Sequence, residues 1–257
     1  MNYIGIDIGS TCAKTVVLNE KKEIIQEFVQ PTGWSSVDTA EEILQKLKLA
    51  GINLSDDPSC CVATGYGRIS VPYADKAVTE ITCHALGAVH LFHQPDLTVI
   101  DIGGQDTKII QIEQGFVKDF IMNDKCAAGT GRFLEVMANT LSLRPNEMFE
   151  LARLGSDTTI SSMCTVFAES EVIGLIGKGE PKENIAYAVV DSTIRKVTAQ
   201  LSRMNGEMST FCLTGGLCEC EYIREALSKK LGKEVISSPD ARYAGAIGAA
   251  LSAMKIR

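Results

Sequence analysis

The chain lacks several features that mark large classes of proteins. Its 257 residues contain no run of about 18 apolar residues, so we expect no membrane-spanning helix. The first ten residues include Asp7 and lack a basic start followed by an apolar core, so we expect no secretory signal. Basic residues are outnumbered 25 to 32, and the net charge of −7 argues against a primary nucleic-acid or anionic-membrane surface.

The chain also lacks a Pro/Ser-rich linker, a repeat array and a low-complexity tract. Its 45% apolar and 22% charged residues are ordinary for a globular protein. The length allows one large α/β domain or two lobes of ~100–150 residues. Nine cysteines without an export signal indicate a reducing cytoplasm and thiols with metal or redox roles, rather than a disulfide framework. We therefore predict a cytoplasmic protein.

A polar turn joins two apolar segments near the N-terminus. Residues 3–18 are typical of a strand that ends near Asp7, a tight Gly-Ser-Thr turn and a second strand. The turn offers backbone N–H groups and two hydroxyls to a phosphate. It is not a Walker A loop, and no helix follows it as in a Rossmann turn. Taken alone, the segment is also consistent with a plain β-hairpin.

The same pattern returns later in the chain. Residues 98–110 repeat strand, Asp, Ile, Gly, polar turn, Lys and strand, and Asp101 stands 94 residues after Asp7. A duplication with this period predicts two similar lobes, 1–95 (completed by the C-terminal helix) and 96–257, each with one glycine turn at a shared cleft. Two carboxylates facing across that cleft would suit Mg²⁺ bound mostly through water and phosphate oxygens.

Two further glycine signatures lie near the C-terminus. Residues 211–217 predict a strand that ends at a Gly-Gly turn before another helix, and residues 244–251 predict a helix whose small residues permit close packing. Paired glycines let the backbone approach a flat ring or a ribose, because no Cβ stands in the way.

A polar stretch of small residues at 123–132 presents one cysteine before an amphipathic helix. We expect Asn123 or Asp124 to cap this helix, so that free N–H groups of its first turn point towards Cys126. The positive end of the helix dipole would then lower the pKa of the thiol. A thiolate there could be a nucleophile, a redox sensor or a ligand to a metal cluster. The plain alternative is a small buried residue at a helix start.

A second cysteine, Cys164, lies in a Ser/Thr-rich turn before another predicted helix. Cys83 and His84 are adjacent on the helix predicted over 80–91, so they point in different directions and joint metal binding is not expected. We predict packing roles for these two residues.

Taken together, these motifs resemble those of a large superfamily. The two Asp-Ile-Gly turns, the Thr-Gly-Gly turn and the terminal Gly-Ala-Ile-Gly helix match, in this order, the phosphate and adenosine motifs of acetate and sugar kinases, Hsc70 and actin. The resemblance implies an α/β fold of two duplicated, ribonuclease H-like lobes with a nucleotide cleft between them.

Four longer stretches resemble one family within that superfamily. They are Thr-Gly-Tyr-Gly-Arg at 64–68, Asp-Ile-Gly-Gly-Gln-Asp at 101–106, Asn-Asp-Lys-Cys-Ala-Ala-Gly-Thr-Gly-Arg-Phe at 123–133 and Cys-Thr-Val-Phe-Ala-Glu-Ser-Glu at 164–171. They are similar to the ATP-dependent activator (reductase) component of (R)-2-hydroxyacyl-CoA dehydratases, of the BadF/BadG/BcrA/BcrD type. The ATPase subunits of benzoyl-CoA reductases are relatives. The resemblance covers essentially the whole chain.

The resemblance implies a homodimer that holds one [4Fe–4S] cluster between its subunits, with Cys126 and Cys164 of each chain as ligands. Such a cluster is usually held by four thiolates, and two per chain doubled by a two-fold axis agree with that count. Five cysteines lie outside these motifs and are predicted to be packing residues: Cys12, Cys60, Cys61, Cys83 and Cys212.

The resemblance also implies roles at the nucleotide, ATP or ADP. Asp7 and Asp101 would hold Mg²⁺ and its waters, and Gln105 would orient the attacking water. The remaining predicted nucleotide-binding residues form three groups: a first turn of Gly9, Ser10, Thr11, Cys12, Ala13 and Lys14, an opposing turn of Gly103, Gly104 and Gln105, and the nucleoside-flanking pair Gly215 and Gly216.

The sequence departs from the family pattern near the nucleotide's base. In that pattern amides follow the Thr-Gly-Gly turn and precede the Gly-Ala-x-Gly helix, whereas Leu-Cys-Glu-Cys at 217–220 and Ala-Arg-Tyr at 241–243 occupy these places here. We predict that Glu219 and Arg242 line the base site, with Arg242 stacking on adenine or reaching a phosphate. Cys218 and Cys220 form a Cys-x-Cys pair without a partner pair, which is a weak metal signal.

The function predicted from this resemblance is ATP-driven one-electron transfer. A reduced ferredoxin or flavodoxin would be the donor, and an iron–sulfur dehydratase or reductase the acceptor. One alternative is a small-molecule kinase of the same fold, with a carboxylate as base. Another is a nucleotide-dependent, chaperone-like module with structural cysteines. The kinase alternative leaves the two cysteine motifs unexplained and would need an inserted substrate region that the chain lacks.

Overall fold

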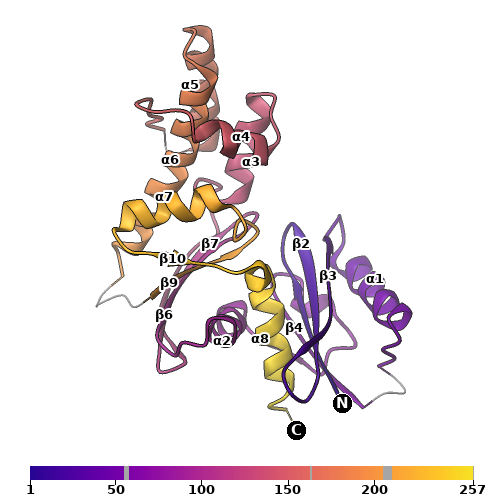
Figure 1. Cartoon of the computed structure of the whole chain (residues 1–257). Coiled ribbons are helices and arrows are strands. Elements are labelled where there is room, and N and C mark those ends of the chain that lie inside the picture. Colours follow the sequence, from indigo (N-terminus) through magenta and orange to yellow (C-terminus); the bar gives the residue numbers. More distant parts are fainter. Residues whose placement is uncertain (55–57, 163, 205–209, 257) are drawn as a thin grey trace. The chain divides into compact units, whose positions relative to one another are not determined.

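The computed structural model describes residues 1–54, 58–162, 164–204 and 210–256. The chain divides into two compact units. Unit 1 comprises Met1–Leu97, Ile112–Lys118 and Asp240–Arg257, and unit 2 comprises Thr98–Gln111 and Asp119–Pro239. Each unit is built on one five-stranded sheet (Figure 1). Among the described helices, none combines the length and apolar character that a membrane crossing requires.

Unit 1 carries the sheet with strand order β3-β2-β1-β4-β5. Strand β1 runs antiparallel to β2, where Asp7 is opposite Lys14, and parallel to β4, where Asp7 is opposite Thr64. The elements of this unit are β1 (Asn2–Ile8), β2 (Cys12–Leu18), β3 (Ile24–Pro31), α1 (Ser36–Leu49), β4 (Ser59–Thr64), the 3₁₀ helix η1 (Arg68–Ser70), β5 (Lys76–Ala77), α2 (Glu80–Phe92) and α8 (Ala244–Ala253).

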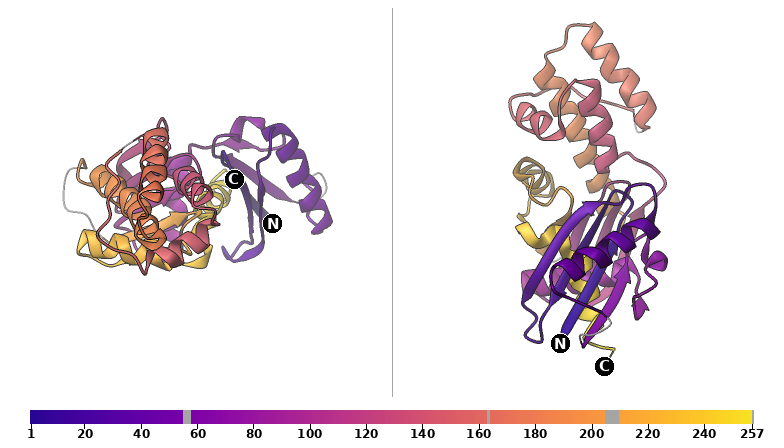
Figure 2. Two further views of the ribbon diagram at one scale, coloured as in Figure 1. Left: turned by 90° about the horizontal axis from the view of Figure 1, so that it is seen from above. Right: turned by 90° about the vertical axis from the view of Figure 1, so that its right-hand side faces the viewer.

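Strand β1 is buried on both faces, and its successive side chains point to opposite faces, so different residues pack on each. Ile4, Ile6 and Ile8 share a core with Ile43 and Leu47 of α1. The right-hand view of Figure 2 shows α1 lying on this face of the sheet. The opposite side of β1 packs against α8. Gly5 lies at this contact, and a Cβ there would overlap the carbonyl oxygen of Ala246.

Helices α2 and α8 meet backbone to backbone. A Cβ at Gly248 would overlap the carbonyl oxygen of Cys83, and one at Gly87 would overlap that of Ala244. A side chain at either position would force the helices apart, which costs stability in a packed interior. The close packing predicted for the small-residue helix is confirmed.

Unit 2 carries the sheet with strand order β10-β9-β6-β7-β8. Ile100 and Ile102 of its strand β6 join a core with Phe133, Val189 and Leu227 from three helices. Figure 1 shows α3 to α6 grouped beyond this sheet. The elements are β6 (Leu97–Ile102), β7 (Thr107–Glu113), β8 (Phe116–Asn123), α3 (Gly131–Thr140), α4 (Pro145–Ala152), α5 (Thr165–Gly177), α6 (Lys182–Leu201), β9 (Thr210–Gly215), α7 (Glu221–Leu231), β10 (Val235–Ile236) and, leading into unit 1, the 3₁₀ helix η2 (Pro239–Tyr243).

The two sheets have the same strand order. The order β3-β2-β1-β4-β5 of unit 1 corresponds to β8-β7-β6-β9-β10 of unit 2, so that β1, which carries Asp7, corresponds to β6, which carries Asp101. The duplicated α/β arrangement predicted from the repeated Asp-Ile-Gly turns is confirmed.

Helix α3 begins later than predicted. Its N-cap is Thr130, so residues 124–130 form a loop and Cys126 lies outside the first helical turn. Asn123 belongs to β8, and its amide donates to the carbonyls of Cys126 (2.8 Å) and Ala128 (3.1 Å). The prediction that Asn123 or Asp124 caps the helix is therefore wrong, because the Asn123 side chain holds the loop instead. The helix dipole consequently carries no argument about the Cys126 thiol.

Candidate functional site

The two predicted phosphate turns have the same backbone geometry. In unit 1 the N–H of Gly9 donates to the carbonyl of Cys12 (3.1 Å), and in unit 2 the N–H of Gly103 donates to the carbonyl of Asp106 (3.0 Å). Both turns lie between the first two strands of their sheet. The repeat in the sequence is thus a repeat in hydrogen bonding.

Thr32, which follows β3, fixes the first turn. Its N–H donates to the carbonyl of Thr11 (2.9 Å), and its hydroxyl donates to the carbonyl of Gly9 (2.7 Å). Because these carbonyls are used, the turn is left to present the exposed side chains of Ser10 and Thr11 and their N–H groups, a surface that suits an anion. The other predicted residues are less exposed: Cys12 and Lys14 are half-buried, and Ala13 is buried.

Asp7 lies at the end of β1 and is only 2% exposed. Two glycines make room for its carboxylate. A Cβ at Gly65 (φ +82°) would overlap Oδ1, and a Cβ at Gly245 would lie 2.6 Å from Oδ2. The same Cβ at Gly245 would lie 2.9 Å from Nε2 of His84, so the His84 ring is beside the carboxylate. The packing role predicted for His84 overlooked this neighbour, which only the tertiary fold brings near.

Asp101, the counterpart of Asp7, is 2% exposed and strongly bound. Its Oδ1 accepts the hydroxyl of Thr214 (2.8 Å), and its Oδ2 accepts the ammonium of Lys108 (3.2 Å). Lys108 is 1% exposed and also pairs with Asp106 (2.8 Å). A buried charge requires such partners. We did not predict a role for Lys108, although the repeat places it 94 residues after Lys14.

The predicted nucleoside pair consists of two unlike glycines. Gly215 has φ +83°, and a Cβ there would lie 2.6 Å from the carbonyl oxygen of Ile102 and 2.8 Å from Oδ1 of Asp101. Gly65 stands in the same relation to Ile8 and Asp7 in unit 1. Gly216 is exposed, and a Cβ there would have no atom within 4 Å, so it leaves open backbone at the turn.

The remaining predicted nucleotide residues lie on surfaces of both units. Gln105 is exposed at the tip of the second turn beside half-exposed Gly104, and Glu219 is exposed after β9. Arg242 is half-buried in η2. Burial and the nearby Asp240 raise the pKa of Glu27, whereas the Arg242 guanidinium lowers it, so Arg242 lies close to the Glu27 carboxyl.

The second phosphate turn is bonded to the segment that follows Cys126. The first two N–H groups of α3 donate to its carbonyls: Gly131 to Gly103 (2.9 Å) and Arg132 to Gly104 (2.8 Å). The hydroxyl of Thr107 also donates to the carbonyl of Gly129 (2.6 Å). Helix N-terminal N–H groups have no partner within the helix. Here they connect the turn to the loop 124–130 that carries Cys126, which we call the cysteine loop.

Cys164 is the N-cap of α5, and its side chain is exposed. The segment before it is fixed by Glu171, whose carboxylate accepts the N–H groups of Ser161 (3.0 Å) and Ser162 (3.1 Å). Partial burial raises the pKa of Glu171, but these hydrogen bonds outweigh it and leave the pKa below its ordinary value. Met163, in the predicted turn, lies outside the described residues.

The cysteines differ sharply in exposure. Cys164 is exposed and Cys126 is half-buried, and none of the nine forms a disulfide bond in the described structure. Burial raises the pKa of Cys83 to about 12 and also raises the pKa values of Cys61 and Cys212. Because the thiolate is the form that binds metal, these three are poor ligands near neutral pH. Within the described ranges, no group of three or more His, Cys, Asp or Glu side chains could hold a metal ion.

The comparison with protein-family models decides the family. The model described as the BadF/BadG/BcrA/BcrD ATPase family matches residues 4–253. The chain belongs to this family. It is 44% identical over 255 residues to the (R)-2-hydroxyglutaryl-CoA dehydratase activating ATPase of Acidaminococcus fermentans, covering 98% of this chain and 96% of that protein. The predicted resemblance is confirmed, and the protein is an ATPase.

Solved structures agree with this membership. The crystal structure of (R)-2-hydroxyglutaryl-CoA dehydratase component A from A. fermentans matches this ATPase with a TM-score of 0.92 at 42% identity, covering 100% of this chain and 98% of that one. The activator of the 2-hydroxyisocaproyl-CoA dehydratase from Clostridium difficile with bound ADPNP matches with a TM-score of 0.90 at 34% identity, covering 100% and 95%. A ROK family glucokinase from Streptomyces griseus, at 16% identity and a TM-score of 0.65 over 99% and 100%, shares the fold alone.

Proposed function

We propose that this ATPase activates an iron–sulfur dehydratase by coupling ATP hydrolysis to the transfer of one low-potential electron. The observation that carries the proposal is a set of three hydrogen bonds made by the segment after Cys126, two with carbonyls of the second phosphate turn and one with Thr107, the first residue of β7. An ATP-driven electron donor needs a physical link between nucleotide and redox site, whereas a small-molecule kinase does not. The names of the relatives, which are dehydratase activators, support the same function.

The two turns would bind the phosphates of ATP. Asp7 and Asp101 would hold Mg²⁺, which usually keeps several waters and binds through one or two carboxylates. Asp101 already accepts Thr214 and Lys108, so it would act on the ion through water. Gln105, exposed at the tip of its turn, would orient the attacking water.

Cys126 and Cys164 would hold the [4Fe–4S] cluster, and the exposed Cys164 and the half-buried Cys126 are both accessible enough for this role. A cluster of this type needs four thiolates. One chain supplies two accessible motif cysteines, so a second copy related by a two-fold axis would complete the set. The bound cluster would supply a one-electron redox centre, loaded by a reduced ferredoxin or flavodoxin.

The helix that begins at Cys164 has an apolar surface suited to a second copy. Large apolar side chains on a solvent face often mark a protein contact. Helix α5 exposes four of them: Val166 (66%), Phe167 (67%), Ile173 (56%) and Ile176 (45%). Because the cluster requires the partner's cysteines next to Cys164, we assign this face to the homodimer contact.

A path of contacts leads from the second turn to both cysteines. The turn holds the start of α3 through Gly131 and Arg132. Further along, the hydroxyl of Thr140 on α3 donates to Glu169 on α5 (3.2 Å), and the two helices share one core. Exchange of ATP for ADP would change the geometry along this path only if the path has two conformations and the two nucleotides differ in their affinity for them.

The energy scale is compatible with ATP. For one electron, ~59 mV corresponds to ~1.4 kcal/mol. Lowering a potential by a few hundred millivolts therefore takes several kcal/mol, which nucleotide hydrolysis can supply. The hydrogen bonds that fix the start of α3 and the loop around Cys126 would transmit this energy as a change in geometry.

Replacing Thr107 with valine tests the link between nucleotide and cysteine loop. Valine keeps the shape but removes the hydrogen bond to the carbonyl of Gly129, a loss of about 1 kcal/mol, or about fivefold in a coupled equilibrium. We expect the acceleration of iron chelation by MgATP to fall about fivefold, while ATP hydrolysis remains within about twofold of wild type. Thr198→Val is the matched control, because in the part of the chain that the structure describes that hydroxyl donates only to carbonyls of α6. An unchanged response of Thr107→Val to MgATP would rule out this path.

The proposed function itself is tested by activation of a dehydratase. The reduced protein and MgATP are added to inactive (R)-2-hydroxyglutaryl-CoA dehydratase with its substrate, and formation of the enoyl-CoA is followed. We expect activation that requires both ATP and reductant. The A. fermentans activating ATPase serves as the positive control. If that control works while this protein neither activates the dehydratase nor any related acceptor, and instead releases ADP in response to a hydroxyl substrate, the kinase alternative holds.

A further inference from the structure

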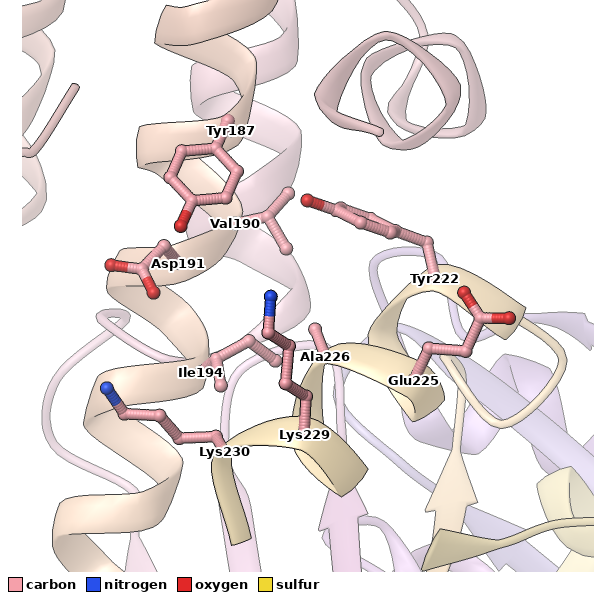
Figure 3. Close-up of a pocket in the computed structure, with 9 residues that line it drawn as sticks. All are labelled: Tyr187, Val190, Asp191, Ile194, Tyr222, Glu225, Ala226, Lys229 and Lys230. Atoms are coloured by element: carbon pink, nitrogen blue, oxygen red, sulfur yellow. The ribbon is translucent and has the colours of Figure 1, made fainter. Parts of the chain in front are cut away.

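Helices α6 and α7 of unit 2 form the walls of a cavity of about 440 Å³ (Figure 3). This volume lies within the usual range of ~300–1,000 Å³ for small-molecule sites. None of its lining residues belongs to the phosphate turns or to the segments around Cys126 and Cys164. ATP hydrolysis and electron transfer, as described above, make no use of it.

The inner wall of the cavity is apolar. Val190 and Ile194 of α6 are 1% and 2% exposed, and Ala226 of α7 lies opposite them. Two aromatic rings extend this wall: Figure 3 shows Tyr187 on α6 and Tyr222 on α7 at the same end of the cavity. Rings and aliphatic side chains in this arrangement favour a flat apolar group over a hydrated ion.

Tyr222 is held in place by groups outside the cavity. Its hydroxyl donates to the carbonyl of Ala152 (3.1 Å), and the guanidinium of Arg153 lies 5.3 Å from the ring centre. Burial, with Tyr187 close by, raises the pKa of Tyr222 to about 12, so the ring is neutral at physiological pH. The cavity wall is therefore preformed.

The charges around the cavity are unequally compensated. Asp191 pairs with Arg195 (2.8 Å), and Glu225 pairs with Arg153 (2.7 Å). Lys229 and Lys230, in contrast, form no ion pair within the part of the chain that the structure describes. Cations in the last turn of a helix are favoured by the helix dipole, which accounts for their place on α7. It does not account for the apolar cavity beside them.

We propose that this cavity binds a small organic anion with a flat apolar body and a carboxylate, sulfonate or phosphate group. The body lies on Val190, Ile194 and Ala226 beside the two tyrosine rings. The anionic group lies at the ammonium groups of Lys229 and Lys230, where the carboxylates of the wall are already neutralised. The geometry thus assigns this ATPase a second ligand site, carried by unit 2 alone.

The test uses 8-anilino-1-naphthalenesulfonate as the probe, because it joins a flat aromatic body to one sulfonate. It is titrated by fluorescence into the anaerobically purified protein. We expect saturable binding, weakened at least about tenfold in the double variant Lys229→Glu/Lys230→Glu. The matched control, Lys178→Glu/Lys182→Glu, reverses two exposed lysines of the same unit outside the cavity and is expected to bind within about twofold of wild type.

A second variant separates shape from charge. Ala226→Leu fills the cavity without changing any charge, and it is expected to weaken the probe as strongly while ATP hydrolysis and the thermal midpoint stay near wild type. Probe binding that is unaffected by both the charge reversal and Ala226→Leu would overturn the proposal. Displacement of the probe by ADP would also overturn it, because the cavity would then belong to the nucleotide. Failure of dehydratase activation, by contrast, leaves these titrations unchanged, so the two proposals fail independently.

Discussion

Replacing Asp7 with asparagine is expected to lower the rate of ATP hydrolysis by at least ~100-fold, or ~2.7 kcal/mol in the barrier, while the iron content stays that of the wild type. Asparagine keeps the size of the side chain, which matters because Asp7 is 2% exposed and Gly65 and Gly245 leave room for little more. It removes the negative charge that would hold Mg²⁺ at the first phosphate turn.

The measurement is steady-state phosphate release with saturating MgATP, combined with iron analysis of the same preparation. Asp96→Asn is the matched control, since Asp96 belongs to unit 1 and, among the described residues, its side chain accepts only the N–H of Gln114 in a loop. It is expected to hydrolyse ATP normally. Normal hydrolysis by Asp7→Asn would remove Asp7 from the catalytic set.

Replacing Cys164 with serine is expected to reduce bound iron to less than about one tenth of the wild-type content. Serine can occupy the N-cap of α5 equally well, so the helix should persist, but a serine hydroxyl is a much weaker ligand than a thiolate for an iron–sulfur cluster. ATP hydrolysis in the absence of an acceptor is expected to continue, because Cys164 lies outside both phosphate turns. Cys126→Ser is expected to behave in the same way.

Cys220→Ser is the matched control for this prediction. Cys220 is also an N-cap residue, of α7, and it belongs to the same unit, but its thiol is half-buried and burial raises its pKa. It is expected to keep its iron. If Cys220→Ser loses iron and Cys164→Ser does not, the Cys-x-Cys pair at 218–220 is the metal site and the ligand assignment is wrong.

The features that could be predicted from the sequence are those that depend on residues close together in the chain. The Asp-Ile-Gly turns recur with a fixed spacing, so they revealed the duplication and with it the common strand order of the two sheets. The small residues of the last helix predicted close packing, because a glycine such as Gly248 is required wherever two backbones touch.

The features that were missed depend on contacts between distant segments. Nothing near Asn123 shows that its amide will hold a loop rather than cap a helix, because the competing N-cap, Thr130, is seven positions further on. The pairing of Lys108 with two aspartates and the bond from Thr107 to Gly129 likewise appear only when β6, β7 and the loop before α3 meet. The cavity between α6 and α7 has no local signature for the same reason.

Iron and acid-labile sulfide per two chains, together with an EPR spectrum after dithionite reduction, would be measured on protein purified without oxygen. A [4Fe–4S] cluster shared by two chains predicts about four irons and four sulfides per two chains and the signal of a reduced [4Fe–4S] cluster, all lost in Cys164→Ser but retained in Cys220→Ser. Protein that holds no iron under these conditions, even after reconstitution with iron and sulfide, would exclude the shared cluster and favour a small-molecule kinase.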